Sequence, residues 1–134
     1  MFTSFYLSLL ALVYFKISLD TIKARLKHKV SLGPGSDNEI GGLVSAHSNF
    51  QAYIPLIGLL MYLYETSQLG YPLLIHAIGL TVLSGRLLHY LGIRDAQAPN
   101  FKLRKAGMHM TLWPLLLLAF LNLINFVYVT RIQG

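Results

Sequence analysis

The sequence predicts an all-α membrane protein, a bundle of four transmembrane helices in one domain. Of its 134 residues, 54% are hydrophobic and only 12% are charged, which is about half the charged share of a soluble domain. Four apolar runs each approach the roughly 20 residues that a helix needs to cross a bilayer. Basic residues gather in two of the three connections between these runs. This composition excludes a multidomain enzyme, a soluble globular protein and a disordered chain.

The four predicted spans cover residues 2–22, 43–64, 71–91 and 106–129. Each is expected to be a helix, because an isolated segment in lipid must satisfy its backbone hydrogen bonds internally. Positive charge follows the first run instead of preceding it, so we expect an uncleaved span and no signal peptide. Asn100, which follows Pro99, is expected to cap the fourth helix, and Asp37 or Asn38 the second.

The distribution of lysine and arginine predicts the orientation in the membrane. Residues 23–29 contain four such residues, the connection between the third and fourth runs contains four, and the turn at residues 65–70 contains none. Cytoplasmic loops carry the excess of positive charge. Both basic connections are therefore expected in the cytoplasm and both termini outside.

Polar side chains near the cytoplasmic side are the candidate site, because polar groups at membrane depth are costly and often functional. In the predicted topology every helix supplies at least one cation, imidazole or amide to this layer, and two helix N-termini add partial positive charge. An anionic ligand fits such a layer. The candidate residues are Arg25, His47, Asn49, Arg86, His89, Arg104 and Lys105.

Other ligand classes fit the sequence less well. The chain has no cysteine, which excludes thiolate ligands and a cysteine nucleophile of its own, and no histidine–carboxylate pair has the spacing of a metal site. The basic residues do not form an aromatic-interleaved patch of the kind that binds nucleic acid. We therefore expect neither a metal nor a nucleic-acid partner.

Several of the polar residues also have purely structural explanations. The arginine at position 86 could extend its side chain to the membrane surface, and His47 or His89 could simply hydrogen-bond between helices. Asn122 and Asn125 share a helix face and are expected to join helices. Lys16 and Asp20 have the spacing of an intrahelical ion pair.

Three motifs and a basic run, in order along the chain, resemble the MAPEG family, the membrane-associated proteins in eicosanoid and glutathione metabolism, and in particular its short bacterial branch. Residues 45–55 read S-A-H-S-N-F-Q-A-Y-I-P, where the family has R-A-H-x-N-x-x-E and a following proline. Residues 85–89 read G-R-L-L-H, and residues 104–111 read R-K-A-G-M-H-M-T, like the bacterial R-x-x-G-M-x-x-T. The basic run is K-A-R-L-K-H-K-V-S-L-G at residues 23–33.

The resemblance implies a homotrimer that binds glutathione, as a cosubstrate, between neighbouring subunits near the cytoplasmic side. Carried over by motif position, Asn49 would hold the tripeptide, Arg86 would bind a carboxylate and Arg104 would stabilise the thiolate. The remaining candidates would support these roles: Arg25, His47, His89 and Lys105. Two positions depart from the motif, since Ser45 replaces its arginine and Ala52 replaces the glutamate that would pair with the ammonium group of glutathione.

The leading functional hypothesis is a glutathione-dependent transferase or peroxidase that acts on lipophilic electrophiles at a bacterial inner membrane. An alternative is a non-catalytic lipid-binding or scaffold member of the family, which the departures at Ser45 and Ala52 favour. A small transporter is a third possibility, but its coupling acid would be expected in mid-membrane, and Glu65 lies at the end of a span. The expected partners are a second copy of the chain, membrane lipid and a lipophilic small molecule.

Overall fold

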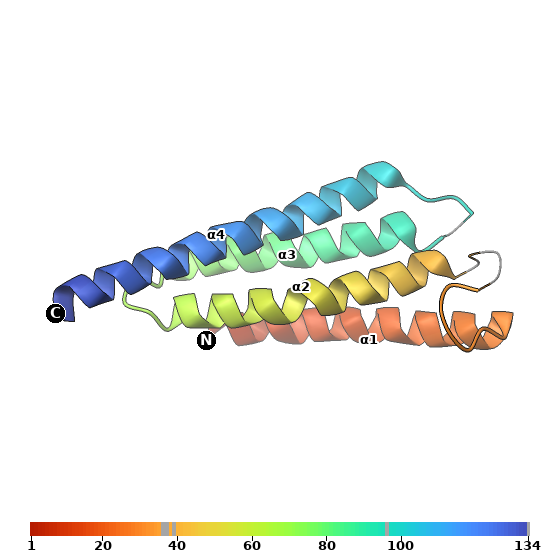
Figure 1. Cartoon of the computed structure of the whole chain (residues 1–134), viewed down its shortest axis with the longest axis horizontal. Coiled ribbons are helices and arrows are strands. Elements are labelled where there is room, and N and C mark those ends of the chain that lie inside the picture. The colour runs from red at the N-terminus through yellow and green to blue at the C-terminus, as the bar shows by residue number, and fades with distance from the viewer. Residues whose placement is uncertain (36–37, 39, 96, 134) are drawn as a thin grey trace.

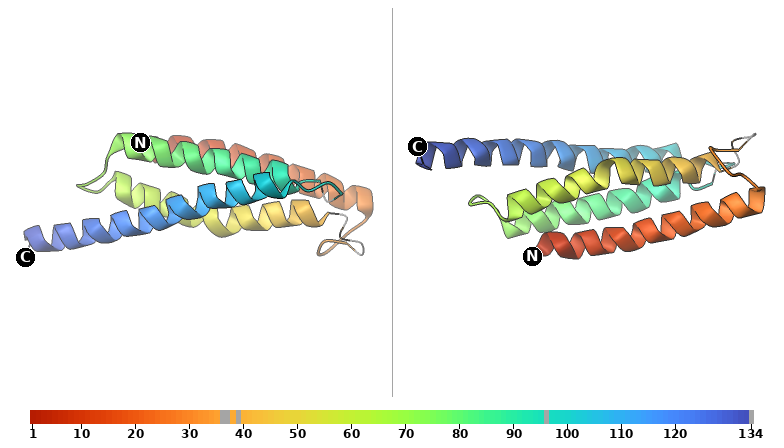
Figure 2. Two further views of the ribbon diagram at one scale, coloured as in Figure 1. Left: turned by 90° about the horizontal axis from the view of Figure 1, so that it is seen from above. Right: turned by 60° about the horizontal axis from the view of Figure 1, so that its bottom comes forward.

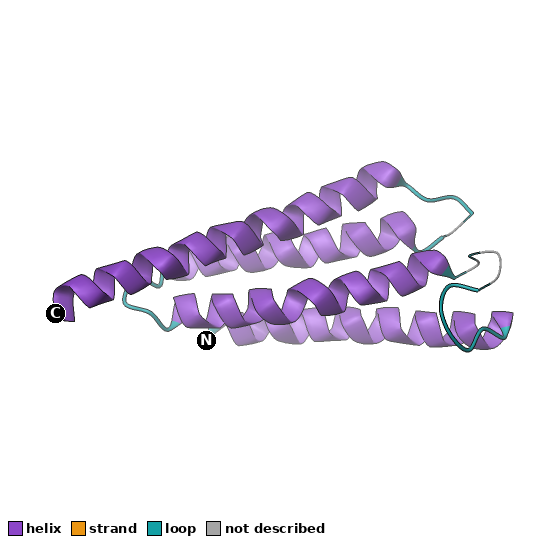
Figure 3. Cartoon of the chain, in the orientation of Figure 1, coloured by secondary structure: helices purple, strands orange, loops and turns teal. Residues whose placement is uncertain are grey.

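The computed structural model describes residues 1–35, 38, 40–95 and 97–133, and within these ranges the chain folds into helices without a strand (Figure 3). The elements are α1 (Phe2–His28), α2 (Gly41–Glu65), α3 (Pro72–Ile93) and α4 (Phe101–Gln133). The predicted all-α fold is confirmed, with one helix for each predicted span.

The four helices run alternately up and down along one long axis (Figure 1). The connections that follow α1 and α3 lie at one end of the bundle, here called the basic end, and the turn after α2 lies at the other with the N-terminus (Figures 1 and 2). α1 packs on α2 and α3, and α4 packs on α2 and most extensively on α3, whereas α1 and α4 do not touch. Short connections between neighbours favour this antiparallel arrangement.

Two helices extend beyond the predicted spans at the basic end. α1 continues to His28, and α4 begins at Phe101, five residues before the predicted start at residue 106. Lysine and arginine are good helix formers, so helical structure continues past the apolar run. α1 ends where Lys29 adopts a left-handed conformation (φ 53°), and its amide bonds to the carbonyls of Arg25 and Leu26. The basic residues of both connections therefore lie largely on helix ends.

The cap of α4 is the one predicted. The Asn100 Oδ1 accepts hydrogen bonds from the amides of Lys102 (3.1 Å) and Leu103 (3.2 Å), which have no partner inside the helix. α2 begins after Ile40 without a side-chain cap. Asn38 contributes its backbone carbonyl to the Gly41 amide (3.1 Å), and Asp37 lies outside the described residues.

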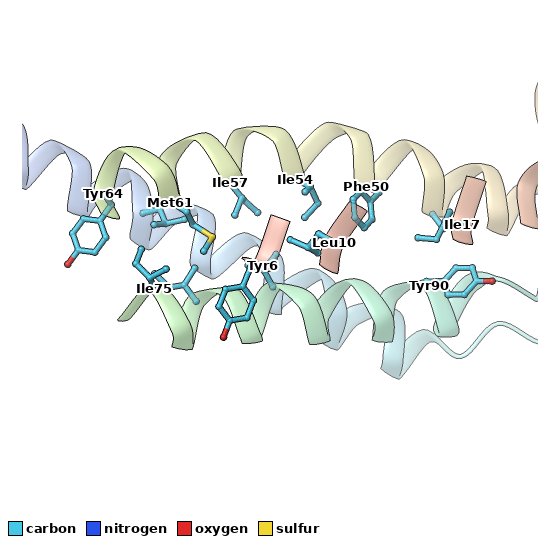
Figure 4. Packing of buried hydrophobic residues seen from close by; sticks show 14 of the residues in the cluster. Tyr6, Leu10, Ile17, Phe50, Ile54, Ile57, Met61, Tyr64, Ile75 and Tyr90 are labelled. Carbon is cyan, nitrogen blue, oxygen red and sulfur yellow. The ribbon is translucent and has the colours of Figure 1, made fainter. Parts of the chain in front are cut away.

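The core lies between the facing sides of the helices, where α2 and α3 point aliphatic and aromatic side chains toward each other (Figure 4). Ile57, Met61, Ile75 and Val82 are fully buried in it. Many other large apolar side chains face outward, among them Leu12, Phe15, Trp113, Phe120 and Leu123. So much exposed apolar surface suits a bilayer and would be a liability in water.

Three helices, α1, α3 and α4, are long and apolar enough to cross a membrane. α2 has comparable length, but its first half carries Ser45, His47, Ser48, Asn49 and Gln51. That α2 also crosses the membrane stays a prediction. The chain is an integral membrane protein in which α2 packs on all three other helices.

Glycines bring α3 and α4 unusually close near the basic end. A Cβ added at Gly107 would lie 2.5 Å from the Gly85 carbonyl oxygen and 2.6 Å from the His89 amide nitrogen, and one at Gly92 would lie 2.6 Å from the Arg104 amide nitrogen. Only a residue without a side chain allows backbones to approach this closely. The contact places the neighbouring Arg86 directly against the backbone of α4.

Candidate functional site

Arg86 is buried between α3 and α4 with only 2% of its surface exposed. One guanidinium nitrogen, Nη2, donates a hydrogen bond to the Gly107 carbonyl (3.3 Å) and lies 3.8 Å from the Met108 sulfur. Its Nε atom has no hydrogen-bond partner among the described residues. Because this side chain is buried against α4, the structure does not support the alternative that Arg86 reaches to the membrane surface. A buried, incompletely bonded cation is costly.

His89 lies three residues further along α3 and is equally buried, at 2% exposure. Its Nε2 has no hydrogen-bond partner among the described residues, so the structure does not support the interpretation of His89 as a simple interhelical link. Residues three apart share a helix face. Buried polar atoms in native proteins are nearly always satisfied, so Arg86 and His89 together offer two unused donors or acceptors to a polar ligand.

Arg104 lies at the start of α4 beside a hollow of about 220 Å³. Gly41, Gly42 and Ser45 from α2 and Ile93 from α3 line it as well. Helix N-termini carry partial positive charge, and those of α2 and α4 both contribute here. Ser45, where the family motif has arginine, faces this hollow, so the substitution removes a second cation from the surroundings of Arg104. Lys105 is exposed and does not line the hollow.

Arg25 and His47 lie on another face, in a groove of about 280 Å³ between α1 and α2. The His47 Nε2 shares a hydrogen bond with the Tyr14 hydroxyl (3.0 Å), so the interpretation of His47 as an interhelical partner is confirmed. Arg25 Nη1 donates hydrogen bonds to the carbonyls of Val30 (3.5 Å) and Ser31 (3.4 Å). These bonds fix the start of the loop that follows α1. The guanidinium is thus positioned at the mouth of the groove.

An apolar groove of about 420 Å³ continues along the same α1–α2 face toward the middle of the bundle. Leu7, Leu10, Ile54 and Pro55 line it, and Tyr14 contributes to its wall beside His47. An apolar molecule could therefore lie in this groove, next to the polar groove that contains Arg25.

The predicted polar layer is therefore divided within a single chain. Asn49 donates its side-chain amide to the Ser45 carbonyl of its own helix (2.9 Å). Arg86 lies with His89, and Arg25 with His47, and neither Arg86 nor His89 lines the hollow at Arg104 or the groove at Arg25. The candidates lie toward the basic end but on different faces of the bundle.

The structure shows partners for three further polar residues. At the opposite end of the bundle, the Tyr6 hydroxyl pairs with His76 Nδ1 (3.1 Å), and Glu65 bonds to the first turn of α1. Nothing in sequence spacing relates these partners.

The expected roles of Lys16, Asp20 and Asn122 are confirmed, and no interhelical bond of Asn125 is observed among the described residues. Lys16 and Asp20 form an ion pair. Asn122 Nδ2 donates to the Leu60 carbonyl of α2 (3.1 Å), which confirms its interhelical role. Asn125 Oδ1 has no partner among the described residues. The described part of the chain contains no cluster of metal-ligating side chains.

The fold and these polar positions define a helical integral membrane protein with a buried cationic site near one end. A sequence model of the MAPEG family matches residues 3–124. The chain is also 32% identical over 123 residues to the inner membrane protein YecN of Escherichia coli strain K12, covering 92% of this chain and 91% of that protein. The YecN of E. coli O6:H1 strain CFT073 matches equally well. The chain belongs to the MAPEG family, as its motifs predicted.

Proposed function

We propose that this protein is a glutathione-dependent transferase or peroxidase acting on lipophilic electrophiles in a bacterial inner membrane. The observation that carries the proposal is the buried guanidinium of Arg86, whose Nε has no partner in the described part of the chain. A carboxylate of glutathione would complete its bonding, because a guanidinium matches a carboxylate with two parallel hydrogen bonds. Family membership and the inner-membrane name of the relatives support the setting.

Arg104 is the proposed catalytic residue. A free thiol with a pKa of about 8.5 is mostly protonated at neutral pH, and a nearby cation or helix N-terminus lowers that value. Arg104 lies at the start of α4 and offers both. The thiol proton would pass to solvent, so no general base from the protein is needed. The thiolate would attack the electrophilic carbon and displace its leaving group as an anion, or attack a peroxide oxygen and break the O–O bond to give the sulfenic acid of glutathione and an alcohol. Lys105 supplies additional positive charge.

The second substrate would come from the bilayer. The apolar groove between α1 and α2 presents Leu7, Ile54 and Pro55 to a hydrophobic molecule, and its polar continuation holds Arg25 and His47. An electrophile would fit if its apolar body lay in the apolar groove and its polar reacting end lay in the groove that contains Arg25 and His47. Lipid partitioning concentrates such a substrate beside the protein.

Assembly as a homotrimer would join the parts of the site that a single chain leaves on separate faces. Small residues at the start of α2 would allow close helix approach between subunits. Ser45 and Ser48 are exposed and available for this contact, whereas Gly41 and Ala46 are buried in their own chain and Gly42 packs against the Ile93 carbonyl. A cation from one copy could then face Arg86 or Arg104 of the next. Native mass spectrometry in mild detergent should show a trimer, and a monodisperse monomer or dimer would contradict the proposal.

A titration with reduced glutathione tests the function. Millimolar reduced glutathione should raise the melting temperature of the purified protein, and the ultraviolet absorbance of a thiolate should appear on binding. S-methylglutathione, which cannot ionise at sulfur, should stabilise the protein without producing that absorbance. A wild-type protein that shows neither stabilisation nor turnover of an activated aryl halide would contradict the proposed activity.

A non-catalytic lipid-binding or scaffold role is the second candidate. It is favoured by Ala52, which has no carboxylate for the glutathione ammonium, and by Ser45 beside Arg104. The same titration separates the two functions, because a scaffold should not respond to the thiol. The variant Ala52→Glu should then introduce glutathione-dependent stabilisation if the missing carboxylate is the reason.

A further inference from the structure

One cavity at the basic end does not belong to the site discussed above. It has a volume of about 600 Å³ and lies at the basic end, where the last turns of α1, the start of α2 and the end of α3 meet. A cavity of this size is within the range of ligand pockets. None of the proposed glutathione-binding residues lines it.

The carboxylate at the inner wall of this cavity is already engaged. Asp20 is paired with Lys16 on its own helix and accepts a hydrogen bond from the Tyr90 hydroxyl of α3. Asp95, at the rim, accepts a hydrogen bond from the Gln97 amide (3.0 Å). The Lys16 ion pair offsets the charge of Asp20, and the hydrogen bond at Asp95 directs one oxygen of that carboxylate toward its own loop.

Two cations face the same space from different elements. Lys27 projects from the last turn of α1, and Arg94 follows the last residue of α3. The Arg94 guanidinium carbon lies 6.0 Å from the centre of the Tyr90 ring, a cation–π distance that keeps the side chain at the cavity. The apolar part of the wall consists of Ala24, Ile40 and Leu43, and the polar side chains of His28 and Gln97 also line the cavity.

We propose that this cavity binds the phosphate group of an anionic phospholipid, with Lys27 and Arg94 on the phosphate and the glycerol region against Ile40 and Leu43. Basic pockets between transmembrane helices on the cytoplasmic side are suited to such headgroups. The apolar wall beside the two cations distinguishes the lipid from inorganic phosphate, which would use only the cations. The site is separate from glutathione binding and does not depend on it.

Native mass spectrometry of the detergent-purified protein with dioleoylphosphatidylglycerol tests the proposal. Wild type should bind this lipid in preference to dioleoylphosphatidylcholine, and the double variant Lys27→Gln/Arg94→Gln should bind it about tenfold more weakly. The matched control is Lys29→Gln/Lys102→Gln, which removes the same charge from exposed positions that do not line the cavity. Both side chains changed in the double variant are exposed, so the fold should survive, and an unchanged melting temperature checks this.

A competition experiment distinguishes a lipid phosphate from free inorganic phosphate as the ligand. Inorganic phosphate at millimolar concentration should not displace the lipid from wild type. If phosphate displaces the lipid, and phosphate binding itself depends on Lys27 and Arg94, then the cavity is a site for free phosphate and the lipid assignment is wrong. Equal lipid binding by wild type and the double variant, or an equal loss in the control, would overturn the proposal.

Discussion

The carboxylate of Glu65, the last residue of α2, binds the first turn of α1 at Thr3. Its two oxygens accept hydrogen bonds from the backbone amides of Phe2 (2.5 Å) and Thr3 (2.9 Å). These amides lack partners inside their own helix, and a negative charge is favourable at a helix N-terminus. A residue more than sixty positions away thus caps α1 and fastens it to the turn between α2 and α3.

The first prediction concerns pH. Burial raises the pKa of Glu65, but the polar groups of Thr3 and the amide of Phe2 outweigh it, and the pKa lies below its usual value of 4.5. A depressed carboxyl pKa stabilises the fold above the unfolded-state value, and this contribution is lost as pH falls through the folded-state value. The melting temperature should therefore decline below about pH 4.5, and Glu65→Gln should reduce the part of that decline due to this group.

At neutral pH, Glu65→Gln should cost about 0.5–1 kcal/mol, as the loss of a charged cap does. Any affinity tag belongs at the C-terminus, so that the first turn of α1 is unaltered. Asp95→Asn is the matched control, because Asp95 is exposed and, among the described residues, bonds to the Gln97 amide of its own loop. Identical acid profiles for wild type and Glu65→Gln would contradict the capping role.

The second prediction concerns the contact between α3 and α4. Gly107→Ala would place a Cβ 2.5 Å from the Gly85 carbonyl and 2.6 Å from the His89 amide nitrogen, both backbone atoms that cannot rotate away. The helices must separate, at a cost of about 1–3 kcal/mol, and the hydrogen bond from Arg86 to the Gly107 carbonyl should weaken. Thermal unfolding in detergent measures the loss.

Gly58→Ala is the control for this substitution. Its Cβ would approach only the end of the Leu7 side chain (2.6 Å), which can change rotamer, so a smaller loss is expected. Equal melting temperatures for wild type and Gly107→Ala would show that α3 and α4 are not held by this close approach.

The third prediction separates binding from chemistry. Arg86→Ala should weaken glutathione binding by about 2–4 kcal/mol, because a carboxylate would be left buried without its partner. Arg104→Ala should retain much of the binding but lose the thiolate absorbance and most of the turnover. Lys105, the next residue along α4, is expected to compensate in part through its charge, so Arg104→Ala/Lys105→Ala should be worse than either single change. Full activity of Arg104→Ala toward an activated aryl halide would refute its catalytic role.

The fourth prediction concerns topology. A single cysteine at Ser31, in the connection after α1, should resist an impermeant maleimide applied to intact cells, and a cysteine at Ser67, in the turn after α2, should react. The chain has no native cysteine to interfere. The reason is the four-zero-four distribution of basic residues over the three connections. The reverse labelling pattern would place the basic end, together with the proposed glutathione site, outside the cytoplasm and would contradict the prediction.

The number and order of the helices could be predicted because they follow from apolar runs alone. Two local interactions could also be predicted from residue spacing: Asn100 caps α4, and Lys16 pairs with Asp20 on its own helix. The family could also be recognised, because its motifs are short stretches of consecutive residues such as Gly85–His89. Each of these features depends on neighbours within a turn or two of helix.

The helix ends, and the faces of the bundle on which the candidate residues lie, could not be predicted from the sequence. A helix continues as long as backbone bonding and propensity allow, so α1 and α4 extend past their apolar runs into the basic residues. Which face a side chain occupies depends on helix rotation and crossing. That is why Arg25 and His47 share one groove while Arg86 and His89 share another environment.

By itself the sequence determined an all-helical membrane protein of the MAPEG family, since hydropathy, charge distribution and motifs are properties of the chain read along its length. Only the tertiary structure decided that Arg86 is buried against Gly107, that Glu65 caps α1 and that Lys27 and Arg94 face one cavity. These relationships join residues on different helices. They depend on how closely glycines let the helices approach and on which faces meet, and both are set by packing in three dimensions.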